Sequence, residues 1–334
     1  MRLLLLLVLV LLQPVSAQAG QATTQQERTR PERSPGWHES SLQHDGLTRY
    51  FRYYIPTRLK KTPALLMVFH GGTRSMRKIF SRHAGGLQEW RQLAEDNGFL
   101  LLAPNGVNIK TGDTRGDHQS WNDCRMPVEG NNSASRADDT GFANALIDWS
   151  QVHFSTDPDR VYITGASNGG MMSLRLVTEL PERITAAAVF IANQPEQTDC
   201  RTPEKPVPLF LLMGTDDPLM PWQGGQILGK GPRMMSAPDT LAFWLKVNRA
   251  DAGRVQSRQL ADIDREDDSI IMRSIYPAAA GGQPVWFYEV RGGGHNLPSV
   301  SHKIGFLGRL IVGNQNHDLE ATREAWRFLR QFNR

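Results

Sequence analysis

The chain has no apolar run of the roughly 20 residues that a membrane-spanning helix needs. Its longest apolar run, Leu3 to Leu12, is about half that length and directly follows Met1-Arg2. Ala17-Gln18-Ala19 then has the A-x-A form of a signal-peptidase site, with Val15-Ser16-Ala17 as a second possible site. The sequence therefore predicts a signal peptide over residues 1–19 and a secreted or periplasmic protein with no membrane anchor after cleavage.

The chain also has little net charge and no concentrated basic segment. Its 38 Lys and Arg against 34 Asp and Glu give a net charge of +4, and Pro31 and Glu32 interrupt the densest basic patch, residues 28–33. No basic stripe carries interleaved aromatics, so we expect no nucleic-acid partner. No HExxH, paired Cys/His cluster, glycine-rich phosphate loop or calcium loop occurs, so neither a metal nor a cofactor is expected.

Cysteine is equally scarce, with only Cys124 and Cys200 in 334 residues. Exported proteins fold where disulfides can form, so we expect these two residues to be bridged. Two free thiols are the alternative. In the chain-entropy model, a bridge that closes a loop of this length contributes roughly 4 kcal/mol at most.

Apolar runs alternate with amphipathic segments from residue 41 to the C-terminus. Before them, residues 20–40 are polar and aperiodic, which predicts a disordered N-terminal lead-in. Expected strands cover 48–56, 63–70, 99–104, 160–165, 186–192, 207–214, 269–276 and 284–290, and expected helices cover 87–98, 139–153, 168–180, 237–248 and 317–332. This alternation predicts one α/β domain over 41–334, with a mostly parallel sheet covered by helices on both faces. The loop at 105–138 is long enough to form a lid or rim of a site.

The stretch "TGASNGGMM", Thr164 to Met172, leaves a buried-looking strand and enters a helix at once. Glycines at i−2 and i+2 from Ser167 are typical of the nucleophile elbow of α/β-hydrolases, a tight turn that exposes the serine hydroxyl above the sheet. An ordinary strand-to-helix turn, with Ser167 as the helix N-cap, is the alternative reading of this stretch alone.

Two further residues follow Ser167 in the chain order of an α/β-hydrolase triad. Asp216 and Asp217 come directly after an apolar strand that ends at Gly214, and His295 follows three glycines after another. Each alone could be an ordinary loop residue, as a turn or capping carboxylate or a surface histidine. Together, in the order Ser, Asp, His, they predict a catalytic triad.

"FHGGT" ends an earlier buried strand, where this fold places part of its oxyanion hole. The backbone N–H groups of Gly72 and Asn168 are the candidate donors. His70 is expected to brace this loop rather than to act in catalysis.

These blocks, together with "SWND" before Cys124, "DDTGF", "GTDDPLMPWQGG", "DTLAFW" and "GGGHNLP", resemble the polyhydroxybutyrate depolymerase esterase family, which also contains feruloyl and acetylxylan esterases. The resemblance spans about residues 50–332. It implies an α/β-hydrolase fold, Ser167 as nucleophile, Asp217 rather than Asp216 as acid, and His295 as base. Family members usually carry an aromatic residue in the second position after the histidine, where this chain has Leu297.

Trp121 and Trp222 lie on loops expected at the rim, where they would form an aromatic platform for substrate; burial in the core is the alternative.

The expected function is a secreted serine esterase acting on hydroxyalkanoate oligomers or similar short-chain esters. Feruloyl or acetylxylan esterase, acyltransferase and non-catalytic binding protein are the alternatives. No polymer-binding module follows the last helix, so soluble or oligomeric esters are expected over crystalline polymer. The sequence does not indicate an oligomeric state.

Overall fold

The computed structural model describes residues 31–81, 86–126, 135–227 and 231–334. Glu32–Arg334 form one compact unit, and Met1–Pro31 are a separate unit. The expected signal peptide and most of the expected lead-in lie outside the described residues. Within the described part of the chain, no helix is both long and apolar enough to cross a membrane.

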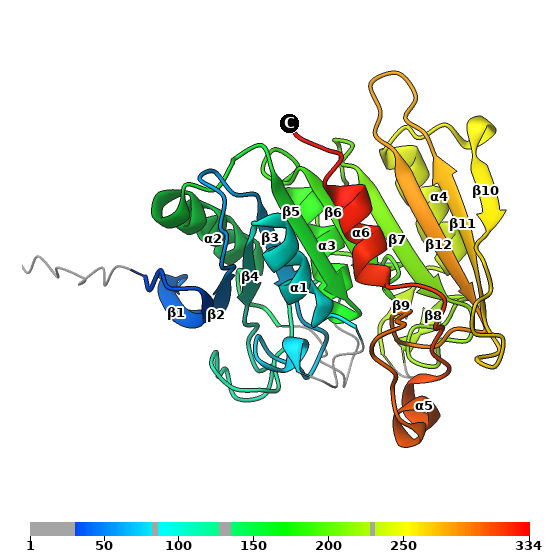
Figure 1. The fold of residues 1–334 in the computed structure, drawn as a ribbon, viewed down its shortest axis with the longest axis horizontal. Helices are drawn as coiled ribbons and strands as arrows, with labels where there is room; N and C mark the ends of the chain where they lie inside the picture. The colour runs from blue at the N-terminus through cyan, green and yellow to red at the C-terminus, as the bar shows by residue number, and fades with distance from the viewer. Residues whose placement is uncertain (1–30, 82–85, 127–134, 228–230) are drawn as a thin grey trace, which may run out of the picture. The chain divides into compact units, whose positions relative to one another are not determined.

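The sheet contains ten strands in the order β1-β2-β4-β3-β5-β6-β7-β12-β11-β10 (Figure 1). The six strands from β4 to β12 in that order are mutually parallel, whereas β2 and β11 pair antiparallel with them on either side. Their bounds are β1 Gly36–His44, β2 Leu47–Ile55, β3 Leu65–Phe69, β4 Leu100–Pro104, β5 Val161–Ala166, β6 Ala186–Phe190, β7 Leu209–Gly214, β10 Gln256–Gln259, β11 Ile270–Tyr276 and β12 Val285–Arg291. The expected mostly parallel sheet is confirmed.

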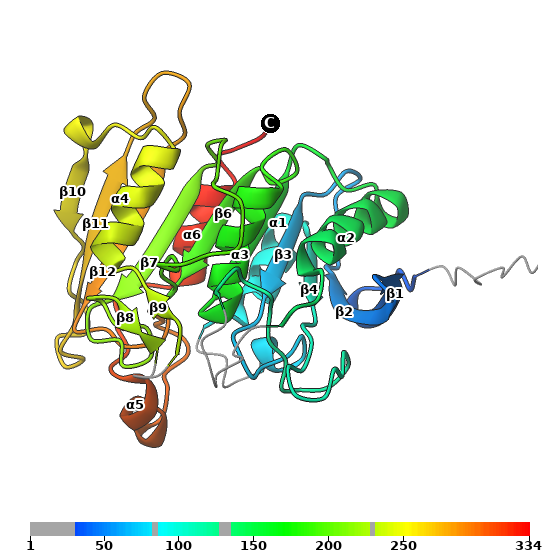
Figure 2. The ribbon, with the colours of Figure 1, turned by 180° about the vertical axis from the view of Figure 1, so that it is seen from behind.

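Helices cover both faces of this sheet (Figures 1 and 2). On one face, α1 and α6 pack into a core that includes Trp90 and Phe328, while α2, α3 and α4 pack on the other with Phe142, Met172 and Trp244. The bounds are α1 Glu89–Asn97, α2 Asp139–Phe154, α3 Asn168–Glu179, α4 Ala237–Val247, α5 Phe306–Val312 and α6 Ala321–Leu329, with short 3₁₀ turns η1 Lys78–Phe80 and η3 Ala252–Arg254. A two-stranded ribbon joins β8 Gly225–Gln226 to β9 Arg233–Met234. The α/β-hydrolase layering that the sequence predicts is present.

The central strands are continuous apolar runs because both faces of the sheet are covered. Every residue of β3, β4, β5, β6 and β7 is buried. Parallel strands buried on both sides carry no polar alternation. Because these strands are also parallel, their carboxyl ends meet at one edge of the sheet, and the loops that follow them lie together.

The expected boundary of the lead-in at residue 40 is wrong by a few residues. Strand β1 begins at Gly36 and pairs antiparallel with β2 along its whole length. Its side chains are exposed or half-buried, so the strand shows no apolar alternation in the sequence. Pairing with β2, rather than burial, holds these residues in the sheet.

Candidate active site

Four loops meet at the carboxyl edge of the sheet. His70-Gly71-Gly72 follow β3, Ser167 follows β5, Asp217 comes shortly after β7, and His295 comes shortly after β12. Because these strands are parallel, their ends lie on the same side of the molecule. The topology thus gathers segments that lie more than 200 residues apart in the chain.

Ser167 has φ +57° and ψ −125°, a backbone conformation that non-glycine residues rarely adopt. Its neighbours leave no room for side chains. A Cβ on Gly165 would lie 2.3 Å from the carbonyl oxygen of Gly169, and a Cβ on Gly169 would lie 2.1 Å from that of Phe69. The two glycines are therefore required by close backbone approach, as the spacing predicts.

The alternative reading of this turn, an ordinary N-cap serine, does not fit the structure. Asn168 is the first residue of α3, and the Ser167 side chain makes no capping hydrogen bond to that helix. The hydroxyl is thus not used to satisfy the helix N-terminus. Ser167 lies instead in a strained turn at the carboxyl end of β5, the position that a nucleophile elbow occupies.

The Asp217 carboxylate lies 2.7 Å from Nδ1 of His295. Its other oxygen accepts hydrogen bonds from the backbone N–H groups of Leu219 and Met220, at 2.8 and 2.7 Å, and its side chain is only 2% exposed. A buried carboxylate held in this way fixes the ring of the histidine and keeps Nδ1 protonated. Nε2 is then left as the proton acceptor.

Asp216, the other member of the pair, is exposed and accepts a hydrogen bond from the hydroxyl of Thr215 at 2.7 Å. The backbone thus turns one carboxylate of the pair toward His295 and the other to the surface. This arrangement supports the choice of Asp217 that the family resemblance implies.

His295 is held by the end of α5 and by the segment that follows it. Its backbone N–H donates to the carbonyl of Val312 at 2.5 Å, and the amide of Asn296 donates to the carbonyl of Asn314 at 2.8 Å. Leu297, which stands where the family usually carries an aromatic, is buried. The histidine loop is therefore fixed from the α5 side as well as by Asp217.

Gly71 and Gly72 lie against the elbow. A Cβ on Gly71 would be 3.4 Å from the carbonyl oxygen of Ala166, and one on Gly72 would be 3.6 Å from Cβ of Asn168. Asn168 opens α3, and the first N–H groups of a helix have no partner within it. The two expected oxyanion donors are thus neighbours, and the positive end of the helix dipole lies beside Ser167.

His70 is fully buried and braces this loop, as expected. Nδ1 lies 2.8 Å from the carbonyl of Gly71, and Nε2 accepts from the N–H of Gly106 at 3.0 Å. Burial in apolar surroundings lowers the pKa of His70 to about 4. The ring is therefore neutral at ordinary pH, which its acceptor role toward Gly106 requires.

The expectation that Trp121 forms part of an exposed rim is wrong. Its side chain is fully buried, and its indole N–H donates to the carbonyl of His70 at 2.8 Å. Its backbone N–H donates to the side-chain oxygen of Asn168 at 2.9 Å. Trp121 therefore clamps the His70 loop to the elbow rather than contacting solvent or substrate.

Trp222 is half-buried and packs against Phe287 and the core. Together with Met220 and Asp217 it lines a crevice that has no room for a water molecule. Of the two tryptophans, only Trp222 remains a candidate for contact with an acyl group.

Asp123 is the main residue of this neighbourhood that the sequence reasoning missed. It is buried, accepts a hydrogen bond from the amide of Asn168, and pairs with Arg125 at 2.8 Å. The only signal was its place in "SWND". Nearby, Asp139 pairs with buried Arg49 at 2.5 Å, and Asp138 caps α2.

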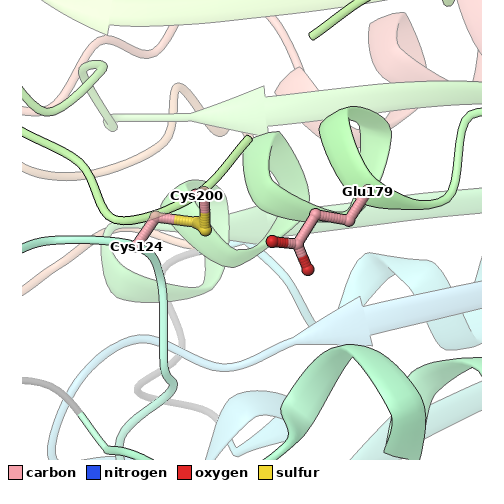
Figure 3. A group of neighbouring side chains, drawn as sticks. All are labelled: Cys124, Glu179 and Cys200. Carbon is pink, nitrogen blue, oxygen red and sulfur yellow. A yellow bond between two sulfur atoms is a disulfide. The ribbon is translucent and has the colours of Figure 1, made fainter. Parts of the chain in front are cut away.

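The expected disulfide is confirmed. Cys124 and Cys200 are bonded, with their Cα atoms 5.3 Å apart (Figure 3). Glu179 lies beside them, and the three side chains together have the spacing of a metal site. Both sulfurs are taken up by the disulfide, however, so this group is a cross-link between the loop after Trp121 and the segment around residue 200.

Comparisons with known proteins agree with this architecture. Residues 86–232 match the model of the dienelactone hydrolase family. The chain is 28% identical over 262 residues to the putative esterase NocK of Nocardia uniformis subsp. tsuyamanensis, covering 71% of this chain and 74% of that protein. It is 25% identical over 179 residues to a bifunctional acetylxylan esterase/xylanase of Neocallimastix patriciarum and 28% identical over 172 residues to a poly(3-hydroxybutyrate) depolymerase of Ralstonia pickettii.

The last two alignments cover 53% and 48% of this chain but only 23% and 32% of those relatives. Among solved structures, an acetyl xylan esterase from Aspergillus awamori superposes with a TM-score of 0.52 at 14% identity, covering 77% of this chain and 94% of that one. A thermostable esterase superposes with a TM-score of 0.50 at 15% identity, covering 89% of this chain and 63% of that one. At such identities the superpositions establish the α/β-hydrolase fold.

Proposed function

We propose that this protein, whose residues 86–232 match the model of the dienelactone hydrolase family, is a carboxylic ester hydrolase that acts through Ser167, His295 and Asp217. The observation that carries the proposal is the 2.7 Å contact between Asp217 and His295 at the same edge of the sheet as the strained Ser167 turn. Nucleophile, base and orienting acid, in this chain order, are the requirements of acyl transfer on this fold.

In this mechanism the hydroxyl of Ser167 attacks the ester carbonyl carbon while Nε2 of His295 takes its proton. Asp217 stabilises the resulting imidazolium. The oxygen of the tetrahedral intermediate accepts hydrogen bonds from the N–H groups of Asn168 and Gly72. Collapse expels the alkoxide, which takes the proton from His295. Water then attacks the carbonyl carbon of the acyl-enzyme while Nε2 of His295 takes its proton. His295 returns this proton to the oxygen of Ser167 as the acid is released.

The proposed substrates are hydroxyalkanoate oligomers or similar short-chain esters. The supporting observation is the similarity of the motif blocks to polyhydroxybutyrate depolymerases, one of which, from Ralstonia pickettii, is a relative of this chain. Acetyl esters of plant polysaccharide are the second candidate, because other relatives are named acetylxylan esterases. We further propose export with cleavage after Ala19, which sequencing of the mature N-terminus checks.

A substitution at Ser167 tests the mechanism. Ser167→Ala should lower ester hydrolysis by about 10⁴–10⁶-fold, because the covalent route is lost. The panel is p-nitrophenyl acyl esters, methyl ferulate, hydroxybutyrate oligomers and acetylated xylan. Ser257→Ala, on exposed strand β10, is the matched control and should keep wild-type rates. A Ser167→Ala enzyme that keeps a tenth of wild-type kcat removes Ser167 from the mechanism.

A further inference from the structure

Helix α5 exposes large apolar side chains at the edge of the sheet that carries the candidate site. None of its seven residues is buried. Phe306 and Leu307 are 75% and 74% exposed, and Leu310 and Ile311 are 68% and 66% exposed. In Figures 1 and 2 the helix projects beyond the ends of the strands. We call these four side chains the α5 face.

An ordinary surface helix buries its apolar side, whereas α5 exposes it. At 100° per residue, positions 306, 307, 310 and 311 fall on one side of the helix, and Gly308 and Arg309 fall on the other. The Arg309 guanidinium is hydrogen-bonded to the side chain of Asn314, which belongs to the loop that leads back to the body. The side that carries Gly308, Arg309 and Val312 is thus tied to the protein, and the side with the four exposed apolar residues faces water.

The helix is attached directly to the catalytic loops. Val312, its last residue, accepts the backbone hydrogen bond of His295 at 2.5 Å. A Cβ on Gly294 would lie 2.1 Å from the same carbonyl oxygen, so the two backbones are in contact. A Cβ on Gly313, just after the helix, would lie 3.4 Å from the carbonyl oxygen of Asp216. The helix that carries the α5 face is thus anchored at its C-terminal end to the histidine and acid loops.

The size of the α5 face argues against a second copy of the chain as its occupant. Four such residues expose on the order of 500 Å², the scale of surface patches that mark interaction sites. Two copies packed face to face would bury roughly 1,000 Å², below the roughly 1,200 Å² of stable protein–protein interfaces.

Charge argues against an anionic membrane. Helices that bind anionic lipid present cations around their apolar residues. Here the Lys303 ammonium is paired with Asp264 at 3.1 Å, and Arg309 is held on the opposite side of the helix. The face itself is uncharged, which suits an uncharged apolar surface.

We propose that the α5 face adsorbs the enzyme to a water-insoluble, uncharged aliphatic ester phase, such as the surface of a solid polyester, and so holds ester groups beside His295. This proposal rests on the proposed esterase function and adds the physical form of the substrate. It departs from the expectation of soluble or oligomeric esters, because a binding surface is built into the catalytic domain. Adsorption requires only burial of the four side chains against the solid, with no bond made or broken.

The test measures binding separately from catalysis. Ser167→Ala enzyme is incubated with poly(3-hydroxybutyrate) granules, and the bound fraction is compared with that of Ser167→Ala carrying Leu307→Gln and Leu310→Gln. Losing two exposed leucines should weaken binding by about tenfold or more. Because both side chains are exposed, the fold should stay intact, which circular dichroism checks. The matched control, Val152→Gln, replaces an apolar residue of α2 that is 70% exposed and should leave binding unchanged.

In enzyme with Ser167 intact, the α5 variant should hydrolyse soluble p-nitrophenyl acetate at a rate within about twofold of wild type. Its rate of granule hydrolysis should fall by about the same factor as its granule binding. Unchanged granule binding by the variant overturns the adsorption proposal, even while soluble ester hydrolysis upholds the esterase function. Tighter binding to phosphatidylglycerol vesicles than to granules, or a dimer that the substitutions dissociate in sedimentation, overturns it in favour of a membrane or a second copy. Absence of Ser167-dependent hydrolysis of any ester instead removes the proposed function.

Discussion

Asp216 and Asp217 differ by one position, and the turn after β7 sends their carboxylates in different directions. Only Asp217 contacts His295, at 2.7 Å, whereas Asp216 is exposed. Asp217→Asn should lower kcat by about 10⁴-fold, because the amide favours the wrong tautomer of the histidine. Asp216→Asn should change kcat by no more than a few-fold. Steady-state kinetics on one p-nitrophenyl ester compares them, and the opposite ranking would make Asp216 the acid.

The low pKa of His70 predicts that the folded protein loses stability in acid. Burial lowers its pKa to about 4, whereas a histidine in the unfolded chain titrates near its ordinary value of about 6.5. Between those values the unfolded state binds the additional proton, so the free energy of unfolding falls as pH drops from about 6.5 to 4. The contribution is about 3 kcal/mol, and it levels off below pH 4.

Urea denaturation at several pH values measures this slope. His70→Gln should flatten it between pH 6.5 and 4, since glutamine does not titrate, although its stability at pH 7 will be lower. His118→Gln, at an exposed position, is the control and should keep the slope of the wild type. An unchanged slope in His70→Gln would show that another group titrates in this window.

For single residues, the sequence predicted the position best where the residue type has few structural roles. A serine between two spaced glycines, followed in order by aspartate and histidine, predicted the contacts found around Asp217. Trp121 was misplaced because an indole ring suits a rim and a core equally well. Its burial depends on a carbonyl acceptor from His70, which lies 51 residues away and leaves no local pattern.

The elbow between β5 and α3 depends on glycine at fixed positions. A Cβ on Gly169 would lie 2.1 Å from the carbonyl oxygen of Phe69, so Gly169→Ala must push α3 away from β3. Such overpacking typically costs about 1–3 kcal/mol of stability. We expect lower stability in chemical denaturation together with reduced ester hydrolysis.

Gly253→Ala is the matched control, because a Cβ there would meet only a side-chain oxygen at 3.4 Å. It should leave both properties near wild type. If Gly169→Ala keeps full stability and activity, the turn is not as tight as the backbone contacts indicate.

Among the elements, buried strands were the most predictable from sequence. Continuous apolar runs gave β3 to β7 nearly at their observed bounds, and Gly98 ended α1 with φ +69° as expected of a helix C-terminus. Strands β1 and β10 were not predicted, since they are held by pairing at the outside of the sheet and bury little. Helix α5 was missed because it is short, contains Gly308 and shows no alternation of buried and exposed residues.

On the scale of the whole molecule, one disulfide joins distant parts of the fold. Cys124 lies three residues after Trp121, and its neighbour Asp123 holds the side chain of Asn168 at the elbow. Reduction should therefore lower thermal stability, by up to roughly 4 kcal/mol in the chain-entropy model, and raise KM more than it lowers kcat.

Thermal denaturation and ester kinetics with and without reductant measure both effects. Mass spectrometry of unreduced, alkylated protein checks the bond itself, and two alkylated cysteines in exported material would refute it. A Cys124→Ala/Cys200→Ala double variant should behave like the reduced enzyme and controls for side effects of the reductant.

The bond between Cys124 and Cys200 also closes the backbone from 124 to 200 into a covalent ring. The ring contains β5, α3, β6 and Ser167. A protease that cuts one peptide bond inside it opens the ring but releases no fragment, whereas a cut outside it divides the chain into two molecules. An enzyme nicked once between these cysteines would thus migrate as one band without reductant and as two with it, and Ser167 would stay tethered to both halves of the sheet.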